Sequence, residues 1–457
     1  MLETIPQADV PFGRNGFIGS WLCGEDGRFE QPPTLTLNFG QHYDNTIPGI
    51  TITWSSVYGE WASRYRVTAW HGERKIHSST WENDSVTSVA AGDIAGYDRV
   101  EIEILAWSRP FRLARVEHIL LGIQKVYRKD ELMDFSADFM VDPLSATLPK
   151  SEISFSIANV DGEYNPDNPR GAEKYLMERQ AVTVRFGYML QGETEWISGG
   201  RYYLSAWETP QNGITASFTA RDAFELMSDP YTGPSSGSLM EIVLAALEQA
   251  NLPPMKDGRE PWQVHASLES IQAPADADLS GNTIAEVLQM AANAACCVLY
   301  QDRAGLIHLE PLESPVTDYE IDRFNSYSNA EMVLTKQLKS IDINNGQYVL
   351  KSGITGETQT ISNPLISQEQ APAAALWAAD FLNNRRLVSG QFRADPRLDP
   401  LDSVTNENQF ARSIVLITEA AFTYNGAFRG SYTGRTLASG MVWPWYAGDL
   451  FCGEVLS

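Results

Sequence analysis

The chain has 457 residues and a formal net charge of −24, because 34 Lys and Arg residues stand against 58 Asp and Glu residues. This acidity argues against a surface built to bind nucleic-acid phosphates, and we expect no sequence-specific nucleic-acid partner. Hydrophobic content of 43% and charged content of 20% are typical of a folded protein of several domains. No apolar run approaches the length of about 18 residues that a membrane span requires, so no membrane span is expected.

The four cysteines (Cys23, Cys296, Cys297 and Cys452) are too few and too dispersed for a disulfide framework. They show no metal-ligand spacing, and we expect free thiols. The first residues, MLETIPQADVPFGRNGF, lack a basic start followed by an apolar stretch, so no signal peptide is expected. Folding in a reducing cytoplasm is the interpretation.

Residues 1–30 show little periodicity and are predicted to be an N-terminal arm. Residues 31–118 are predicted to form a β-sandwich domain, because short apolar-patterned segments alternate with turn residues and no helical pattern interrupts them. The expected strands are 35–39, 50–54, 65–70, 99–107 and 112–121.

Residues 119–226 are predicted to form a further β domain. Ile153, Phe155 and Ile157 alternate with small residues, which is the period of a strand buried on one face. The pattern repeats at 182–186, and the link NVDGEYNPDNP at 159–169 is rich in turn formers. Segments 202–207 and 214–219 are expected to pair through a turn at 210–213.

Residues 227–315 are predicted to be an α+β region. Ser238 with Glu241, and Thr283 with Glu286, are spaced as capping boxes that open helices ending near 250 and 295. The run CCVLYQDRAGLIHLEPL then predicts a hairpin that turns at 302–305.

Residues 316–440 return to a β pattern. Asn-Gly turns predict hairpins around 344–346 and around 425–426. A helix is expected over 371–387, with Leu376, Phe381 and Leu382 facing inward. The aromatic segment 441–457 is predicted to be a C-terminal docking tail, and docking on a neighbour or on a local edge both stay open.

No catalytic or metal site is predicted. The six histidines are scattered, without triad or ligand spacing, and no phosphate-binding loop or cofactor motif is present. Asp395, Asp399 and Asp402 in RADPRLDPLDSV invite a reading as paired carboxylates for glycoside cleavage. Their interleaving with Arg and Pro instead favours an extended, ion-paired connection. We therefore predict a protein that is not an enzyme and needs no cofactor.

Aromatic residues in the sandwich domain are candidates for carbohydrate binding, because sugar rings stack on flat exposed aromatic faces. Trp54 shares a strand face with Ile50 and is expected in the core. The candidates in loop-like surroundings are Tyr58, Trp61 and Trp81. Packing inside the domain or between domains is the alternative reading of these rings.

Three stretches together resemble the hub proteins of bacteriophage tails, found at the tail tip or baseplate: 151–188, 199–222 (GGRYYLSAWETPQNGITASFTARD) and 391–435. The resemblance covers roughly residues 119–440. It implies a mainly β fold with an α+β middle region, in which two tail-tube-like β-barrels, at 119–226 and 316–440, flank an inserted domain at 227–315. Residues 31–118 resemble a discoidin-like jelly roll of the kind found in tail proteins and carbohydrate-binding modules.

The resemblance implies a structural tail protein of a phage or prophage virion, assembled in the bacterial host cytoplasm. As a homotrimer with six barrels, the hub would close the tail tube and adapt a six-fold tube to a three-fold tip. The implied partners are a tube or distal tail protein on one side and a fibre, spike or tape-measure protein on the other. The alternative is a receptor-recognition tail protein whose jelly roll binds a host-surface glycan.

Overall fold

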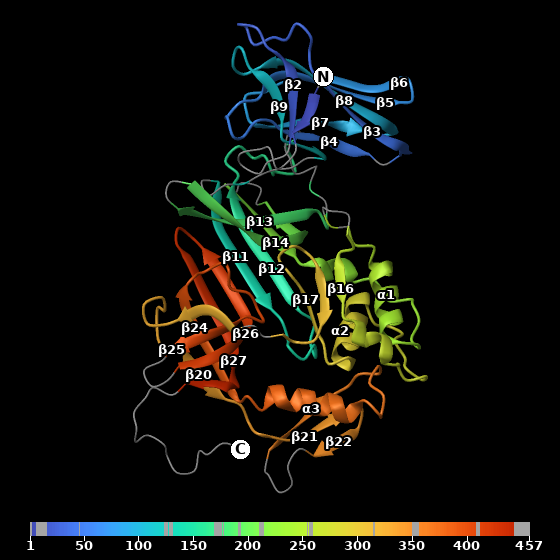
Figure 1. Ribbon diagram of the computed structural model, residues 1–457, viewed down its shortest axis with the longest axis vertical. Helices are drawn as coiled ribbons and strands as arrows, with labels where there is room; N and C mark the ends of the chain where they lie inside the picture. The colour runs from blue at the N-terminus through green and yellow to red at the C-terminus, as the bar shows by residue number, and fades with distance from the viewer. Residues whose placement is uncertain are drawn as a thin grey trace. The chain divides into compact units, whose positions relative to one another are not determined.

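The computed structural model describes residues 2–5, 16–44, 46–122, 127, 131–168, 176, 178–190, 193–209, 214–253, 255, 259–313, 316–349, 356–407 and 412–442. The fold is mainly β, as the sequence predicts. The chain divides into two compact units, residues 1–127 and residues 128–457 (Figure 1). No helix within these ranges is long and apolar enough to cross a membrane.

Unit 1 consists of three sheets around one apolar core. Their strand orders are β3-β8-β5-β6, β10-β4-β7 and β1-β2-β9. The strands are β1 (Leu2–Ile5), β2 (Gly16–Leu22), β3 (Thr34–Tyr43), β4 (Ile47–Thr53), β5 (Ala62–His71), β6 (Arg74–Glu82), β7 (Thr87–Ile94), β8 (Tyr97–Trp107), β9 (Leu113–Val116) and β10 (His118–Leu121). The sequence did not indicate β6 and β7. Within the segment predicted to be an arm, β2 pairs with β9.

The core of unit 1 is centred on Trp54, which is fully buried, as predicted. Its ring lies edge-on to Tyr65, with ring centroids 5.1 Å apart, and its Nε1 donates to Ser88 Oγ at 2.9 Å. Burial of so large a ring stabilises the unit, and the hydrogen bond offsets the cost of burying the indole N–H. The jelly-roll assignment of this unit stays a prediction.

Unit 2 is built on one sheet of eleven strands. Its main order is β13-β14-β15-β12-β11-β26-β27-β24-β20, and β25 joins β19 to β26. The strands are β11 (Leu132–Met140), β12 (Lys150–Ala158), β13 (Ala181–Leu190), β14 (Glu193–Glu208), β15 (Thr215–Arg221), β19 (Val316–Ile321), β20 (Glu331–Leu334), β24 (Arg386–Arg393), β25 (Ser403–Glu407), β26 (Arg412–Tyr424) and β27 (Phe428–Val442).

The two segments predicted as separate barrels meet at the pairing of β11 with β26. The register runs antiparallel from Phe135↔Tyr424 to Met140↔Glu419. Figure 1 shows β11 and β12 (teal) beside β26 and β27 (red). Side chains from both segments share one core, in which Ile153 of β12 and Phe422 of β26 are fully buried. The two segments are therefore parts of one continuous sheet.

Neither half closes into a barrel within the described residues, so the two expected barrels are not found. The reason is that β11 has only two edges, and these are taken by β12 and β26, so β13 cannot pair with it. Instead β13 lies across the same core: the Phe186 ring lies 5.9 Å from Phe135 and 5.4 Å from Phe428, between ring centroids. Side-chain contacts, rather than backbone hydrogen bonds, therefore hold β13 against β11 and β27.

Alternation along the strands gives the sheet two different faces. Across β11, β12 and β15, Ala137, Ile153 and Ala220 are register partners on the core face. The neighbouring row on the other face contains Ser136, Ser154 and Thr219, of which Ser154 and Thr219 approach through their hydroxyl oxygens at 3.3 Å. The sequence period of two is the cause of this division.

The α+β region forms as predicted. Helices α1 (Leu239–Ala250) and α2 (Ile284–Ala294) both begin with complete capping boxes, at Ser238 and Thr283. Strands β17 (Val298–Gln301) and β18 (Ile307–Glu310) form the expected hairpin. β16 (Trp262–Val264) pairs with β18, and the short 3-10 helices are η3 (Ala223–Met227) and η4 (Ala266–Ser270).

Helix α3 (Ala371–Leu382) packs against β21 (Leu338–Ile343), which pairs with β22 (Gly346–Val349) and β23 (Glu357–Ile361) (Figure 1). These elements join the core of α1 and α2, although they lie in the segment predicted as the second barrel. Leu376 is 62% exposed, so its predicted inward position is wrong. The buried face instead consists of alanines (Ala371, Ala374, Ala375, Ala378 and Ala379). Short side chains let the helix axis approach β21 closely, and the helix ends five residues earlier than expected, before β24.

Candidate functional sites

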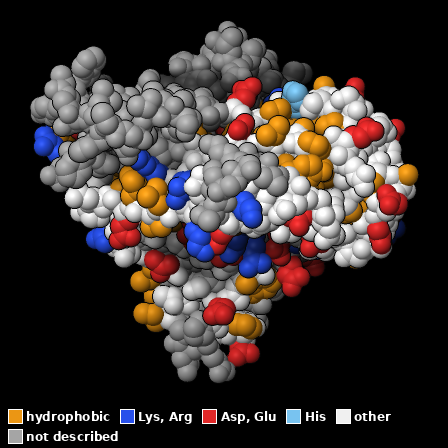
Figure 2. All heavy atoms as spheres, turned by 90° about the horizontal axis from the view of Figure 1, so that it is seen from below, with side chains coloured by type: hydrophobic (Ala, Val, Ile, Leu, Met, Phe, Trp, Pro, Cys, Tyr) orange, Lys and Arg blue, Asp and Glu red, His pale blue; other side chains and the backbone are white. Residues whose placement is uncertain are grey.

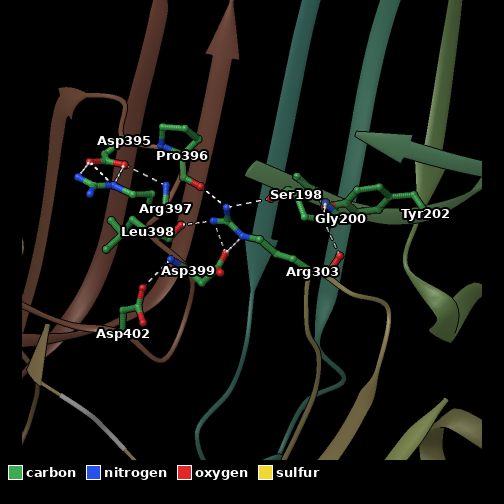
Figure 3. Close-up of polar contacts among 11 residues, drawn as sticks. Ser198, Gly200, Tyr202, Arg303, Asp395, Pro396, Arg397, Leu398, Asp399 and Asp402 are labelled. Atoms are coloured by element: carbon green, nitrogen blue, oxygen red, sulfur yellow. Dashed lines mark hydrogen bonds and ion pairs between the residues drawn. The ribbon is translucent and has the colours of Figure 1, made fainter. Parts of the chain in front are cut away.

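Of the three aspartates that invited a catalytic reading, Asp399 binds Arg303, whose side chain is mostly buried (Figure 3). Arg303 comes from the turn between β17 and β18. Its Nε donates to Asp399 Oδ1 at 2.7 Å, and its Nη2 donates to the Leu398 carbonyl at 3.0 Å. Nη1 donates to the carbonyls of Pro396 and Ser198. One side chain thus connects the α+β region, β14 and the segment before β25.

The shape of β14 at this junction depends on a glycine. Gly200 has φ +114°, a conformation that favours glycine. A Cβ at Gly200 would lie 2.4 Å from Tyr202 Oη, which donates to the Gly199 carbonyl at 2.9 Å. Ser198 Oγ in turn donates to the Arg303 carbonyl at 3.0 Å, so the turn and the strand bind each other in both directions.

The three aspartates are committed to structural contacts. Burial raises the pKa of Asp399, against the influence of Arg303, and burial likewise raises the pKa of Asp402. Asp402 accepts a hydrogen bond from the Asp399 amide at 2.8 Å. Burial opposes the charge of Asp395, but the paired hydrogen bonds from Arg397 prevail and lower its pKa. The predicted ion-paired connection is therefore what the segment forms.

The turn-rich link that follows β12 uses side-chain oxygens within its own turns. Asn159 Oδ1 accepts from the Tyr164 amide at 3.0 Å, and Asn165 Oδ1 accepts from the Asp167 amide at 2.9 Å. The Tyr164 ring is buried against Phe218 with centroids 5.3 Å apart. Across the described residues no group of three or more His, Cys, Asp or Glu side chains is placed to hold a metal ion.

The three aromatic candidates in unit 1 do not converge on one surface. Tyr58 is 54% exposed, with the Arg115 guanidinium carbon 4.2 Å from its ring centroid. Trp61 and Trp81 are half-buried against the core, and Trp81 Nε1 donates to Ser79 Oγ at 2.9 Å. No ring contact joins any two of them in the described part of the chain. Their role in glycan binding stays a proposal.

The two ends of the eleven-stranded sheet are candidate interfaces. Within the described residues, β13 and β20 each pair along one edge only. Both expose apolar side chains: Tyr188 and Met189 on β13 are each 72% exposed, and Val333 and Leu334 on β20 are 59% and 63% exposed. A sheet edge with apolar side chains readily pairs with another chain unless something covers it.

The charges do not form a uniformly basic surface on the face shown in Figure 2. Lys and Arg side chains gather near the middle of that face, with acidic side chains among and around them (Figure 2). A face that grips a nucleic-acid backbone would carry one continuous basic stripe. The expectation of no sequence-specific nucleic-acid partner stays a prediction.

Sequence reasoning missed Arg303 and the free edges. Arg303 lies in a DRAG turn, and nothing in the turn indicates that its side chain contacts residues about 95 positions later. The β20 strand shows no alternation of apolar and polar residues that would have indicated an exposed edge strand. Only the interleaved Arg and Asp residues of 393–402 gave a signal, and that signal was for ion pairing.

No family model matches the chain, and no curated protein matches its sequence. Solved structures similar to it include the 43 kDa tail protein of prophage MuSo2 from Shewanella oneidensis, with 15% identity, a TM-score of 0.45, and coverage of 70% of this chain and 94% of that one. A tail protein from Neisseria meningitidis MC58 has 12% identity, a TM-score of 0.45 and coverage of 68% and 93%. An E. coli component of the type VI secretion system, described as similar to the T4 tail proteins gp27 and gp5, has 11% identity, a TM-score of 0.42 and coverage of 69% and 76%.

Proposed function

We propose that this chain is a structural hub of the tail tip or baseplate of a phage or prophage. As a homotrimer in the virion tail it closes the tail tube and adapts six-fold tube symmetry to a three-fold tip. Its partners are a tube or distal tail protein on one side and a fibre, spike or tape-measure protein on the other. The role is non-enzymatic.

The observation that carries the proposal is the pairing of β11 with β26. It joins the two segments of the chain that resemble tail hubs, near 119–222 and 391–435, into one sheet. A subunit that builds a ring requires such a continuous sheet, because the two ends of the sheet must be held rigidly relative to each other. Arg303 supports that rigidity by binding β14, the 396–399 segment and its own turn together.

The free edges of β13 and β20 supply a way to associate. They lie at opposite ends of the strand order, so the edge of one copy can pair with the other edge of the next copy. Such a head-to-tail contact generates a closed ring if a whole number of equal rotations completes a full turn. For a trimer each copy is rotated by a third of a turn relative to the one before it. Association covers the apolar side chains of both edges, including Tyr188 and Val333.

The test is the mass of the purified full-length chain in solution, measured by native mass spectrometry and sedimentation. We expect three copies per particle. Val333→Lys with Leu334→Lys, on the exposed β20 strand, is expected to give monomers that keep the far-UV circular dichroism spectrum of the wild-type fold. The matched control is Leu376→Lys, an equally exposed leucine on α3, which should stay trimeric. A monomeric wild-type chain, or trimers in the β20 variant, would contradict the edge pairing.

The tail location is tested separately, in the phage or prophage that encodes the chain. Antibody against the chain is expected to label one end of purified tails in electron micrographs. Deletion of its gene is expected to leave tails that lack a tip. Label along the whole tube, or intact tips after the deletion, would show that the chain is not a hub.

A further inference from the structure

Two Asn-Gly pairs lie at the tips of hairpins in unit 2. Asn345-Gly346 lies between β21 and β22, and Asn425-Gly426 lies between β26 and β27. Both asparagines are exposed. The other Asn-Gly pairs of the sequence, at 15–16 and 212–213, include residues outside the described ranges. The two hairpins therefore allow one local sequence to be compared in two backbone settings.

An Asn-Gly pair can react with itself. The glycine nitrogen attacks the side-chain amide carbon of the asparagine: a bond from this nitrogen to Cγ forms, and the bond from Cγ to Nδ2 breaks. Ammonia leaves with the proton that the glycine nitrogen gives up. Water then opens the succinimide ring at either of its carbonyl groups, which gives aspartate or isoaspartate. Water is the only co-reactant, and glycine favours the attack because it has no Cβ to obstruct it.

The turn at Asn345 is held against this reaction. Asn344 and Asn345 both have positive φ, at 49° and 68°, and Gly346 is the register partner of Ile343 across this two-residue turn. Asn344 Nδ2 donates to the Asn363 carbonyl at 2.7 Å, and the Asn363 amide donates to Asn344 Oδ1 at 2.9 Å. The peptide between Asn345 and Gly346 must rotate before its nitrogen reaches the side chain, and that rotation breaks the pairing with Ile343.

The turn at Asn425 has no such restraint. The three residues 425–427 connect Tyr424 and Phe428, the last register partners of β26 and β27. All three are exposed, and within the part of the chain that the structure describes none of them makes a hydrogen bond. The peptide that follows Asn425 can therefore rotate without breaking one.

The space around the two glycines differs in the same sense. A Cβ at Gly426 would have no heavy atom within 4 Å apart from its chain neighbours. A Cβ at Gly346 would lie 3.2 Å from the Ile343 carbonyl oxygen. The attacking nitrogen of Gly426 thus lies in open space, whereas that of Gly346 lies in a closed turn.

We propose that Asn425 is a site of spontaneous deamidation in the folded protein, and that the backbone of its turn protects Asn345. The product carries a new negative charge, and isoaspartate also lengthens the main chain of the loop by one carbon atom. The loop adjoins Phe428, whose ring stacks on Phe422 at 5.7 Å and lies 5.4 Å from Phe186 of β13, between centroids. The modification therefore occurs beside the contacts that hold β13 on the core. It does not depend on the tail-hub role, because the reaction takes place within one loop.

The experiment incubates the purified full-length chain at mildly alkaline pH and maps its peptides by mass spectrometry, which detects the replacement of the amide NH₂ by OH. We expect Asn425 to deamidate at least about tenfold faster than Asn345, because the 344–346 turn must open before it reacts. The rate at Asn425 should rise with pH, since the attacking nitrogen loses a proton. In concentrated urea both turns are lost, and the two rates are expected to agree to within about twofold.

Two variants separate the parts of the proposal. Asn425→Gln keeps a side-chain amide, but its longer side chain must close a six-membered ring, which forms more slowly. It is expected to abolish the conversion at position 425 and to leave Asn345 as in wild type. Asn344→Ala removes the contacts with Asn363 and is expected to speed deamidation of Asn345 several-fold, with Asn425 unchanged and the far-UV circular dichroism spectrum retained.

Four results would overturn the proposal. They are no conversion of Asn425 in the folded chain, equal rates at Asn345 and Asn425, the same ratio of rates with and without urea, or an unchanged rate at Asn345 in Asn344→Ala. The third result would mean that sequence rather than backbone setting decides the rate.

Discussion

In unit 1 the buried Trp107 donates to Glu60 Oε2 at 3.0 Å across 47 residues, and Trp54 donates to Ser88 across 34 residues. In unit 2 the Leu299 amide donates to Ser145 Oγ at 2.9 Å across 154 residues, and Asn293 Nδ2 donates to the Leu144 carbonyl at 2.8 Å across 149 residues. These two buried hydrogen bonds of unit 1 therefore join residues much nearer in sequence than those of unit 2. Unit 2 uses its buried hydrogen bonds to attach its α+β region to a distant part of the sheet.

This difference shows what fixes the arrangement of unit 2. Apolar contacts are non-directional, so a helical layer can slide on a sheet at little cost. A buried hydrogen bond fails completely when its partners shift, because each unpaired group loses its solvation. The polar attachments of unit 2 thus specify one position of the α+β region.

The largest expected effect is that of Arg303→Met. The change removes every guanidinium hydrogen bond of the junction and leaves Asp399 without its cation. We expect the free energy of unfolding of unit 2 to fall by about 3–4 kcal/mol, with unit 1 unaffected. Urea unfolding followed by hydrogen exchange, which reports each unit separately, measures this. Equal losses of unfolding free energy in the two units would contradict the idea that these polar attachments stabilise unit 2 alone.

The second effect concerns pH. Burial raises the pKa of Asp222 to about 7, although the amides of Ser151 and Phe224 donate to its carboxylate. Because the folded-state pKa lies above the unfolded value, the folded state binds the proton more tightly, and stability decreases as the pH rises towards 7. The loss from this group between pH 5 and pH 8 is on the order of 3 kcal/mol.

Unfolding in urea at a series of pH values, for wild type and Asp222→Asn, isolates this contribution. The variant cannot ionise, so the difference between the two curves should shrink or reverse as the pH rises from 5 to 8. A constant difference over that range would mean that Asp222 is already ionised at pH 5. Because Asp222 caps η3 beside the start of β12, the effect belongs to unit 2.

A smaller effect is expected for Asn293→Leu, matched by Trp107→Phe in unit 1. Asn293 is 2% exposed, and its loss takes a donor from the Leu144 carbonyl and removes one of the two acceptors of the Asn363 side-chain amide, which also donates to the Met290 carbonyl. Each variant is expected to lose about 2 kcal/mol of unfolding free energy. Only Asn293→Leu should also speed hydrogen exchange throughout α2, since it releases the attachment to the sheet. The same exchange pattern in both variants would remove the distinction between the units.

The smallest effect is that of Arg397→Met. Arg397 donates to Asp395 through two nitrogens, but its side chain is 72% exposed. An exposed pair of this kind contributes less than about 1 kcal/mol. Urea unfolding is expected to show that small loss of unfolding free energy, in contrast to the large loss expected for Arg303→Met in the same region (Figure 3). A loss as large as that of Arg303→Met would mean that exposure does not decide the importance of these ion pairs.

Local sequence signals predicted local structure well. The capping boxes at Ser238 and Thr283 open helices because their partners lie three residues away. The turn at 344–346 forms because both Asn344 and Asn345 adopt positive φ, at 49° and 68°. The mainly β fold follows from the same local periodicities. Strands β6 and β7 were missed because polar residues interrupt their apolar pattern.

Signals for distant contacts were absent. One edge of β11 pairs with β12, and nothing in the sequence of β11 indicates that the other edge pairs with β26 rather than with β13. The sequence therefore could not distinguish a closed barrel from an open sheet. On α3 three larger side chains were expected to face inward. Phe381 and Leu382 do pack partly buried against the core, but the fully buried positions are alanines and Leu376 is exposed. The role of Arg303 depends on residues 198 and 396–399 meeting in space, which one sequence does not reveal.

The pairing of β11 with β26 has a consequence for synthesis. Met140 and Glu419 are register partners separated by 419 − 140 = 279 residues, so the ribosome must add all of these before the pair can form. At about 5–20 residues per second, that interval lasts roughly 15–60 s. Throughout it the nascent chain carries an incomplete half-sheet, exposed to other polysomes and to chaperones. Folding of this chain therefore depends on the conditions of translation more than its finished sheet suggests.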